Sequence, residues 1–148
     1  MKRTYIKNAR IVNEGQVFEG SLVIADEVIA EVLKAGELPS VACEETIDAQ
    51  GCYLLPGVID DHVHFRDPGL THKADMYTES MAAAAGGVTS YMDMPNTNPQ
   101  TTTLEALEDK FKDAATKSIV NYSFYFGATN NNADSLASCC RLRNEIQD

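Results

Sequence analysis

The sequence predicts an α/β protein in which a small β-domain precedes the N-terminal part of a (β/α)8 barrel of the TIM type. Three observations lead to this prediction. Residues 4–54 read as short apolar strands separated by turn residues, residues 58–148 alternate strand and helix three times, and Pro56-Gly57 separates the two patterns. The predicted domains are therefore 1–56 and 57–148.

The β-domain is predicted from short apolar runs that end at turn residues. No stretch with the period of a helix occurs before Pro39. Turn residues occur at 13–15, at 26–27 and at Gly36. The apolar residues are Ile6, Ile11, Val12, Val17, Phe18, Leu22, Val23, Ile24, Val28, Ile29, Val32 and Leu33.

The second domain is predicted from strands and helices that alternate without a hairpin. Strands are expected over 58–65, 88–94 and 121–126. Helices are expected at 81–85, at 104–117 behind a capping box of Thr102 and Glu105, and from Asp134 onward. The third helix should turn Leu136, Cys139, Cys140 and Ile146 inward. This alternation implies parallel strands joined by crossovers, and because a complete barrel takes about 250 residues, we expect the first three βα units of a larger enzyme.

Composition excludes several classes of function. The 148 residues are 44% hydrophobic and 23% charged, as in globular proteins, and the net charge of -10 argues against nucleic-acid binding. No apolar stretch approaches the roughly 20 residues that span a bilayer, and the start does not read as a signal peptide. Four cysteines without C-x-x-C spacing (Cys43, Cys52, Cys139 and Cys140) indicate reduced thiols and a cytoplasmic location.

His62 and His64 are the strongest candidates for chemistry. They are two residues apart on a predicted strand, so their side chains should leave the same face at the end where barrel enzymes keep their active sites. Two imidazoles with this spacing can bind one divalent metal ion. The alternative is a pair of half-buried histidines on an edge strand. We favour the metal site because two of the three histidines lie here, whereas His72 is expected on the surface.

Polar residues next to this pair are candidate ligand-binding groups. Arg66 continues the same alternation and offers a guanidinium fork to a carboxylate, although a salt bridge with Asp67 or Asp75 is an alternative. Asn96 follows the second strand and can donate to a carboxylate or close an Asx-turn. Two further residues are left open: Asp60 could orient an imidazole or form a turn, and Asp93 is unassigned.

These motifs resemble a known family. Asp48-Ala49 with Gly51, followed by Pro56 to Asp60, His62 and His64, is similar to the signature of the amidohydrolase superfamily. Phe65 to Gly69, Ala82 to Gly87 and Met94 to Thr97 with Pro99 resemble the dihydroorotases within it. The resemblance implies that 1–56 is part of a composite β-sandwich built from both chain ends, and that 57–148 begins a metal-dependent hydrolase barrel.

The resemblance also implies roles for individual residues. His62 and His64 would ligate the more buried of two zinc ions, and His64, Arg66 and Asn96 would bind the carboxylated substrate. The bridging ligand, two more histidines and the catalytic aspartate are expected beyond Asp148, so no catalytic residue is assigned within this chain.

The reaction implied by the resemblance is the zinc-dependent, reversible cyclisation of N-carbamoyl-L-aspartate to L-dihydroorotate in pyrimidine biosynthesis. The expected partner is a small-molecule substrate, with no nucleic acid and no membrane, and homo-oligomerisation is left open. Three alternatives remain: an allantoinase or hydantoinase-like cyclic amidase, a non-catalytic amidohydrolase-like assembly protein, and a truncated product without a function of its own.

Overall fold

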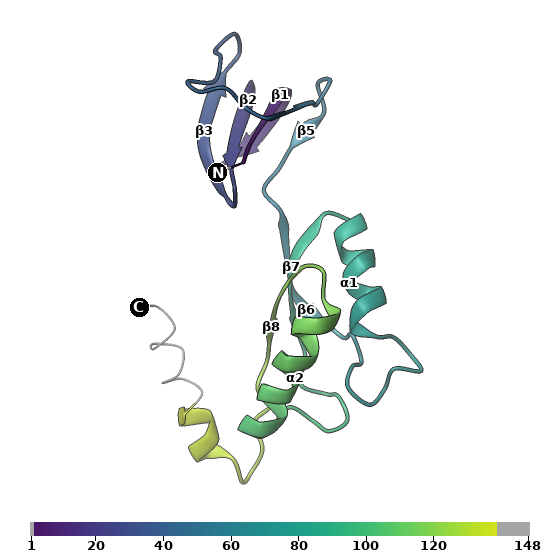
Figure 1. Ribbon diagram of the computed structural model, residues 1–148. Helices are drawn as coiled ribbons and strands as arrows, with labels where there is room; N and C mark the ends of the chain where they lie inside the picture. The colour runs from purple at the N-terminus through teal and green to yellow at the C-terminus, as the bar shows by residue number, and fades with distance from the viewer. Residues whose placement is uncertain (1, 139–148) are drawn as a thin grey trace. The chain divides into compact units, whose positions relative to one another are not determined.

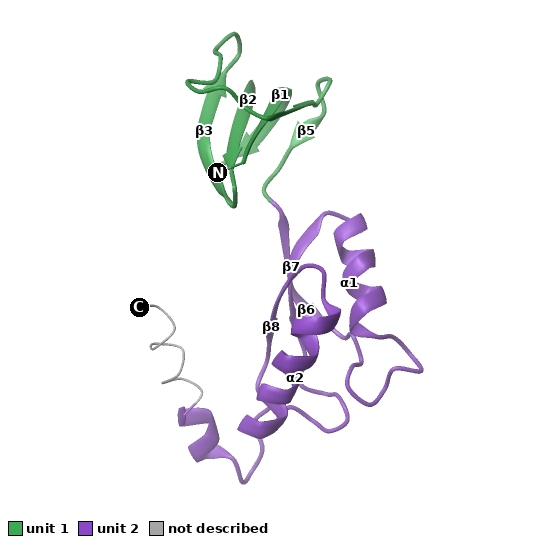
Figure 2. Cartoon of the chain, viewed as in Figure 1, with its two compact units in different colours: residues 1–56 green, residues 57–148 purple. Residues whose placement is uncertain are grey.

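The computed structural model describes residues 2–138 (Figure 1). The chain divides into two compact units, Met1–Pro56 and Gly57–Asp148, and each has its own sheet (Figure 2). Backbone at 133–138 is helical, while the predicted inward residues Cys139, Cys140 and Ile146 lie outside the described residues. Within 2–138, no helix has the length and apolarity needed to cross a membrane.

The first unit is a five-stranded sheet. Its strands are β1 (Arg3–Asn13), β2 (Gln16–Ala25), β3 (Val28–Lys34), β4 (Glu45–Asp48) and β5 (Tyr53–Leu54). The sheet has the order β3-β2-β1-β4, with β5 also pairing with β1. Strands β1 to β3 are antiparallel, and the first hairpin closes through Glu14 and Gly15, both at positive φ as a two-residue hairpin turn requires. The strands and turns predicted for 4–54 are therefore confirmed.

The second unit contains a parallel sheet with two helices. Its strands are β6 (Val58–Val63), β7 (Val88–Asp93) and β8 (Asn121–Phe124), paired in the order β6-β7-β8. Helix α1 (Met76–Ala85) connects β6 to β7, and α2 (Leu104–Lys117) connects β7 to β8. All pairings are parallel, so the predicted alternation and strand direction are confirmed.

Four boundaries differ from the prediction. Helix α1 begins at Met76, five residues before the expected Met81, because the Asp75 carboxylate caps it by accepting the Thr78 N–H (2.9 Å). The predicted capping box at Thr102 is wrong, since α2 is capped by Thr103, whose hydroxyl accepts the Ala106 N–H (3.2 Å). The first and third strands end two residues early, at Val63 and Phe124.

The core of this unit lies between the helices and one face of the sheet. Its buried members are Phe65, Met76, Tyr91, Ala114 and Phe124. The rings of Phe65 and Tyr91 lie 4.3 Å apart between centroids. Phe65 lies two residues after the end of β6, so burial of its ring fixes the start of the loop that carries the predicted site.

Candidate functional site

The predicted site residues lie at the carboxyl ends of β6 and β7. His62 is on β6, His64 and Arg66 follow that strand, and Asn96 lies three residues after β7. Backbone hydrogen bonds join the two loops: Met94 N–H donates to Val63 O and Asn98 N–H to Pro68 O, both at 3.0 Å. Because parallel strands end at the same edge of their sheet, residues far apart in sequence meet here.

The two histidines of the predicted metal site lie side by side. Their ring centroids are 5.3 Å apart and the rings are tilted by 59°. Both residues are exposed, so neither imidazole is enclosed by the apolar core. Of the alternative interpretation, the edge position of β6 in the described sheet is observed, whereas the half-burial of the two histidines is not.

Asn96 contacts His64 directly. Its Oδ1 lies 2.9 Å from His64 Nδ1, and since a carbonyl oxygen only accepts, Nδ1 is the donor. In the tautomer with the proton on Nδ1, the lone pair is on Nε2, the form in which a histidine ligates a metal while its other nitrogen is held. The two neighbouring imidazoles supply two nitrogen ligands of the kind that zinc binds. Within 2–138, no group of three or more His, Cys, Asp or Glu side chains could hold a metal ion.

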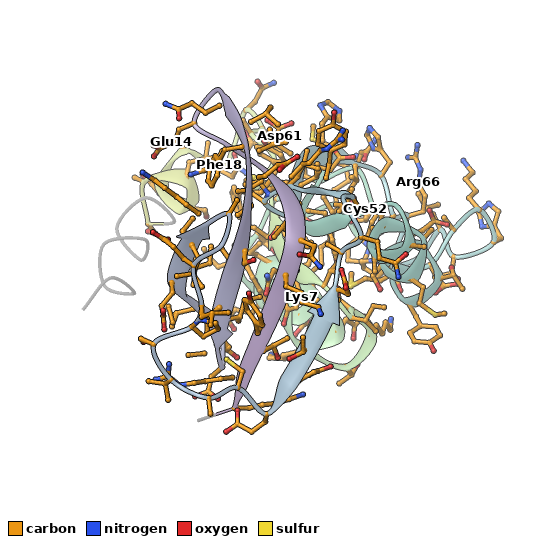
Figure 3. The ribbon with its side chains drawn as sticks, turned by 90° about the horizontal axis from the view of Figure 1, so that it is seen from above. Lys7, Glu14, Phe18, Cys52, Asp61 and Arg66 are labelled. Carbon is orange, nitrogen blue, oxygen red and sulfur yellow. The ribbon has the colours of Figure 1, made fainter. Side chains whose placement is uncertain are left out.

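Asp60 and Arg66 each had two interpretations. The Asp60 carboxylate accepts the backbone N–H of His62 at 3.2 Å, within β6 where the pairing with β7 is irregular. Arg66 is half-buried at φ 64°, and its side chain extends away from the ribbon (Figure 3). In the part of the chain that the structure describes, Arg66 makes no salt bridge, because Asp67 pairs with Lys117 and Asp75 caps α1.

The site thus presents polar donors that have no partner of their own. The Asn96 side-chain nitrogen makes no hydrogen bond to any residue within 2–138, nor does the Arg66 guanidinium. Gly69, at φ 80°, packs so closely on the Asn98 carbonyl that a Cβ would overlap it, which keeps the two loops together. These donors can bind an anion such as a carboxylate. His72 is exposed, as expected for a surface residue.

The sequence analysis did not identify a buried ion pair behind the site. Asp93 Oδ2 lies 2.7 Å from Lys110 Nζ, and both side chains are at most 1% exposed. Asp93 Oδ1 accepts the Phe65 N–H at 2.9 Å, and Lys110 also donates to Met94 O at 3.2 Å. Burial lowers the pKa of Lys110, while the Asp93 carboxylate opposes that shift. A signal was present, because Lys110 interrupts the apolar face of α2 between Leu107 and Ala114.

Comparisons with known proteins find similarity along most of the chain. The Dihydro-orotase-like family matches residues 51–140. A dihydroorotase of Methanosarcina acetivorans is 41% identical over 131 residues, which are 88% of this chain and 28% of that protein. A dihydroorotase of Methanothermobacter thermautotrophicus is 46% identical over 87 residues, 59% of this chain and 20% of that protein.

Solved structures show the same likeness. An L-hydantoinase (dihydropyrimidinase) from Arthrobacter aurescens matches with a TM-score of 0.88 and 31% identity, over 96% of this chain and 31% of that chain. A D-hydantoinase matches with a TM-score of 0.78 and 32% identity, over 97% of this chain and 31% of that chain. This chain therefore spans less than a third of the length of each relative.

Proposed function

The chain belongs to the dihydroorotase-like family, and on that premise we propose that it supplies metal-binding and substrate-binding residues of a dihydroorotase. The proposed reaction is the zinc-dependent, reversible cyclisation of N-carbamoyl-L-aspartate to L-dihydroorotate in pyrimidine biosynthesis. In this proposal residues 1–56 are part of a composite β-sandwich, and 57–148 are the first three βα units of a (β/α)8 barrel. The names of the relatives support a cyclic amidohydrolase.

The contact between His64 and Asn96 is the observation that supports this proposal best. It links the imidazole pair to the next strand and leaves His64 Nε2 available as a ligand. His62, with its ring centroid 5.3 Å away, would be the second ligand of the same zinc ion. When bound, zinc polarises a carbonyl and lowers the pKa of water to about 7, which suits hydrolysis of a ring amide.

Arg66 and Asn96 would recognise the carboxylate that dihydroorotate and carbamoyl aspartate share. A guanidinium binds a carboxylate through two parallel hydrogen bonds, and the Asn96 NH2 group can add a third. A hydantoinase-like cyclic amidase is the second candidate, since solved hydantoinases resemble this chain. We favour dihydroorotase because Arg66, two residues after His64, makes no salt bridge within 2–138.

We also propose a small-molecule enzyme of the cytoplasm. The net charge of -10 opposes binding to nucleic acid, and Cys43 and Cys52 are free thiols.

The metal assignment can be tested in an active chimera. This chain replaces the matching segment of the Methanosarcina acetivorans dihydroorotase, and bound zinc and dihydroorotate hydrolysis are measured. His62→Ala should lower the zinc content and abolish turnover, because it removes one of the ligands. His72→Ala is the matched control and should change neither. Normal zinc content and full activity in His62→Ala would exclude His62 as a ligand.

The substrate assignment is tested by Arg66→Met in the same chimera. Charge-assisted hydrogen bonds contribute about 1.5–3 kcal/mol, so kcat/KM for dihydroorotate should fall by about 10- to 150-fold with zinc content unchanged. Lys73→Met removes an exposed cation from the same loop and should have little effect. Unchanged kinetics in Arg66→Met would favour an uncharged cyclic amide as the substrate.

A further inference from the structure

The segment that carries Arg66 is held at its start by the Asp93–Lys110 pair. Asp93 is the last residue of β7, and its carboxylate accepts the N–H of Phe65, which lies between His64 and Arg66. Lys110 Nζ lies 2.7 Å from that carboxylate and 4.7 Å from the centroid of the Phe124 ring. Neither charged group reaches solvent, so the pair contacts only the protein interior.

The same segment is held at its end by a second ion pair. The Asp67 side chain is 4% exposed, and its two oxygens lie 3.2 and 3.0 Å from Lys117 Nζ. The same carboxylate accepts the Met76 N–H at 3.4 Å, at the start of α1. Lys110 and Lys117 are seven residues apart on α2, so they lie on one face of that helix.

Arg66 therefore lies between two ion pairs whose lysines are both on α2. We call Asp93–Lys110 the first anchor and Asp67–Lys117 the second anchor. The Arg66 backbone is at φ 64°, a left-handed conformation that costs a non-glycine residue about 1–3 kcal/mol and persists only where the surroundings impose it. The Phe65 N–H and the Asp67 carboxylate are the neighbouring groups that are held. Replacing a buried ion pair by apolar side chains of similar volume is often neutral or stabilising, so stability alone does not explain the charges of Asp93 and Lys110.

We propose that Asp93, Lys110, Asp67 and Lys117 are positioning residues that hold His64 against Asn96 and present Arg66 to the substrate. The inference rests on the proposed function for what His64 and Arg66 bind. It does not rest on that function for the placement itself, which is a property of this chain.

Two matched double variants of the 148-residue chain test the first anchor. Asp93→Asn/Lys110→Met removes both charges but keeps an oxygen that can accept the Phe65 N–H. Asp93→Leu/Lys110→Met removes the same charges and also the acceptor, at similar side-chain volume. Circular dichroism reports whether each variant folds, and NMR reports amide exchange at Phe65 and the ring nitrogens of His64.

We expect the leucine variant to differ from the asparagine variant at the site. Amide exchange at Phe65 should be at least about 10-fold faster, because a hydrogen bond to a buried acceptor is lost. The His64 ring should change from the Nδ1–H form to a mixture of tautomers, while His72 stays the same in both variants. Identical Phe65 exchange and His64 tautomer in two folded variants would overturn the proposal.

Lys117→Met tests the second anchor. Lys117 is 36% exposed, so this variant keeps the proposal falsifiable even if the leucine variant does not fold. The amide signals of Arg66 and Asp67 should shift while Phe65 exchange stays close to that of the unmodified protein. Lys112→Met, which breaks an exposed pair with Asp109 on the same helix, is the control and should move neither signal. Unchanged Arg66 and Asp67 signals in Lys117→Met would overturn the proposal.

These readouts need neither metal nor turnover. If Arg66→Met leaves dihydroorotate kinetics unchanged, the proposed function fails while the positioning result stands. If neither anchor's variants change these NMR signals, the positioning inference fails while the proposed function is unaffected.

Discussion

Lys110→Met should strongly destabilise the unit Gly57–Asp148. The substitution keeps an apolar stem of similar length but removes the cation 2.7 Å from a carboxylate that is 1% exposed. Breaking a buried pair from one side costs about 3–5 kcal/mol, because the remaining charge is left without compensation. Asp93 still accepts the Phe65 N–H, so we expect a value near the lower end, about 3 kcal/mol.

Urea unfolding followed by far-UV circular dichroism measures this loss. With a slope of about 2 kcal/mol per M, the midpoint should fall by about 1.5 M. The control Lys112→Met removes one side of a pair that is 70% and 65% exposed, and should cost less than about 1 kcal/mol. Asp93→Asn/Lys110→Met should recover most of the loss, since no buried charge remains.

If Lys110→Met costs no more than Lys112→Met, then the Asp93 carboxylate does not depend on its buried cation. If the double variant is less stable than Lys110→Met alone, uncompensated charge is not the cause of the loss.

Two further predictions concern the loops and the core. Gly69→Ala should lower the free energy of unfolding by more than Gly87→Ala. Both glycines have positive φ, but only at Gly69 would a Cβ overlap a neighbouring atom, the Asn98 carbonyl. Equal losses of about 1 kcal/mol in urea unfolding would contradict this close contact. Burial raises the pKa of Tyr91 to about 12. The protonated hydroxyl therefore contributes its full stabilisation below pH 10, and this stabilisation is lost as the pH rises from 10 to 12. Tyr91→Phe should therefore make unfolding less dependent on pH in that window, and an unchanged dependence would argue against a buried Tyr91 hydroxyl.

Most of the secondary structure could be predicted because it depends on local sequence. The short apolar runs of 4–34 that end at turn residues and the helix-period face of 104–117 are visible without any tertiary information. Helix α1 shows where this fails. Its first turn, from Met76 to Glu79, is mostly polar, so periodicity placed the start at Met81, although Asp75 is a good N-cap residue.

The site could be predicted only in part, for the same reason. Strand alternation in the sequence predicts that His62 and His64 share a face, and their rings do lie together although β6 ends at Val63. The contacts between His64 and Asn96, 32 residues apart, and between Asp93 and Lys110 depend on how two loops and a helix pack against the sheet. Sequence marks Asp93 and Lys110 as polar residues in apolar surroundings, but it does not show that they pair.

The exposed and the buried side chains at the β6–β7 edge differ in whether their polar groups are paired within the protein. The exposed side carries groups with free donors or lone pairs, His62, His64 and Asn96, which suits ligand binding. The buried side carries Asp93 and Lys110, whose charges are matched within the protein. Since apolar substitutes for a buried pair are often neutral or stabilising, stability alone does not account for charges at these positions. We therefore expect stability and placement to separate: an apolar replacement that raises the free energy of unfolding should still speed amide exchange at Phe65.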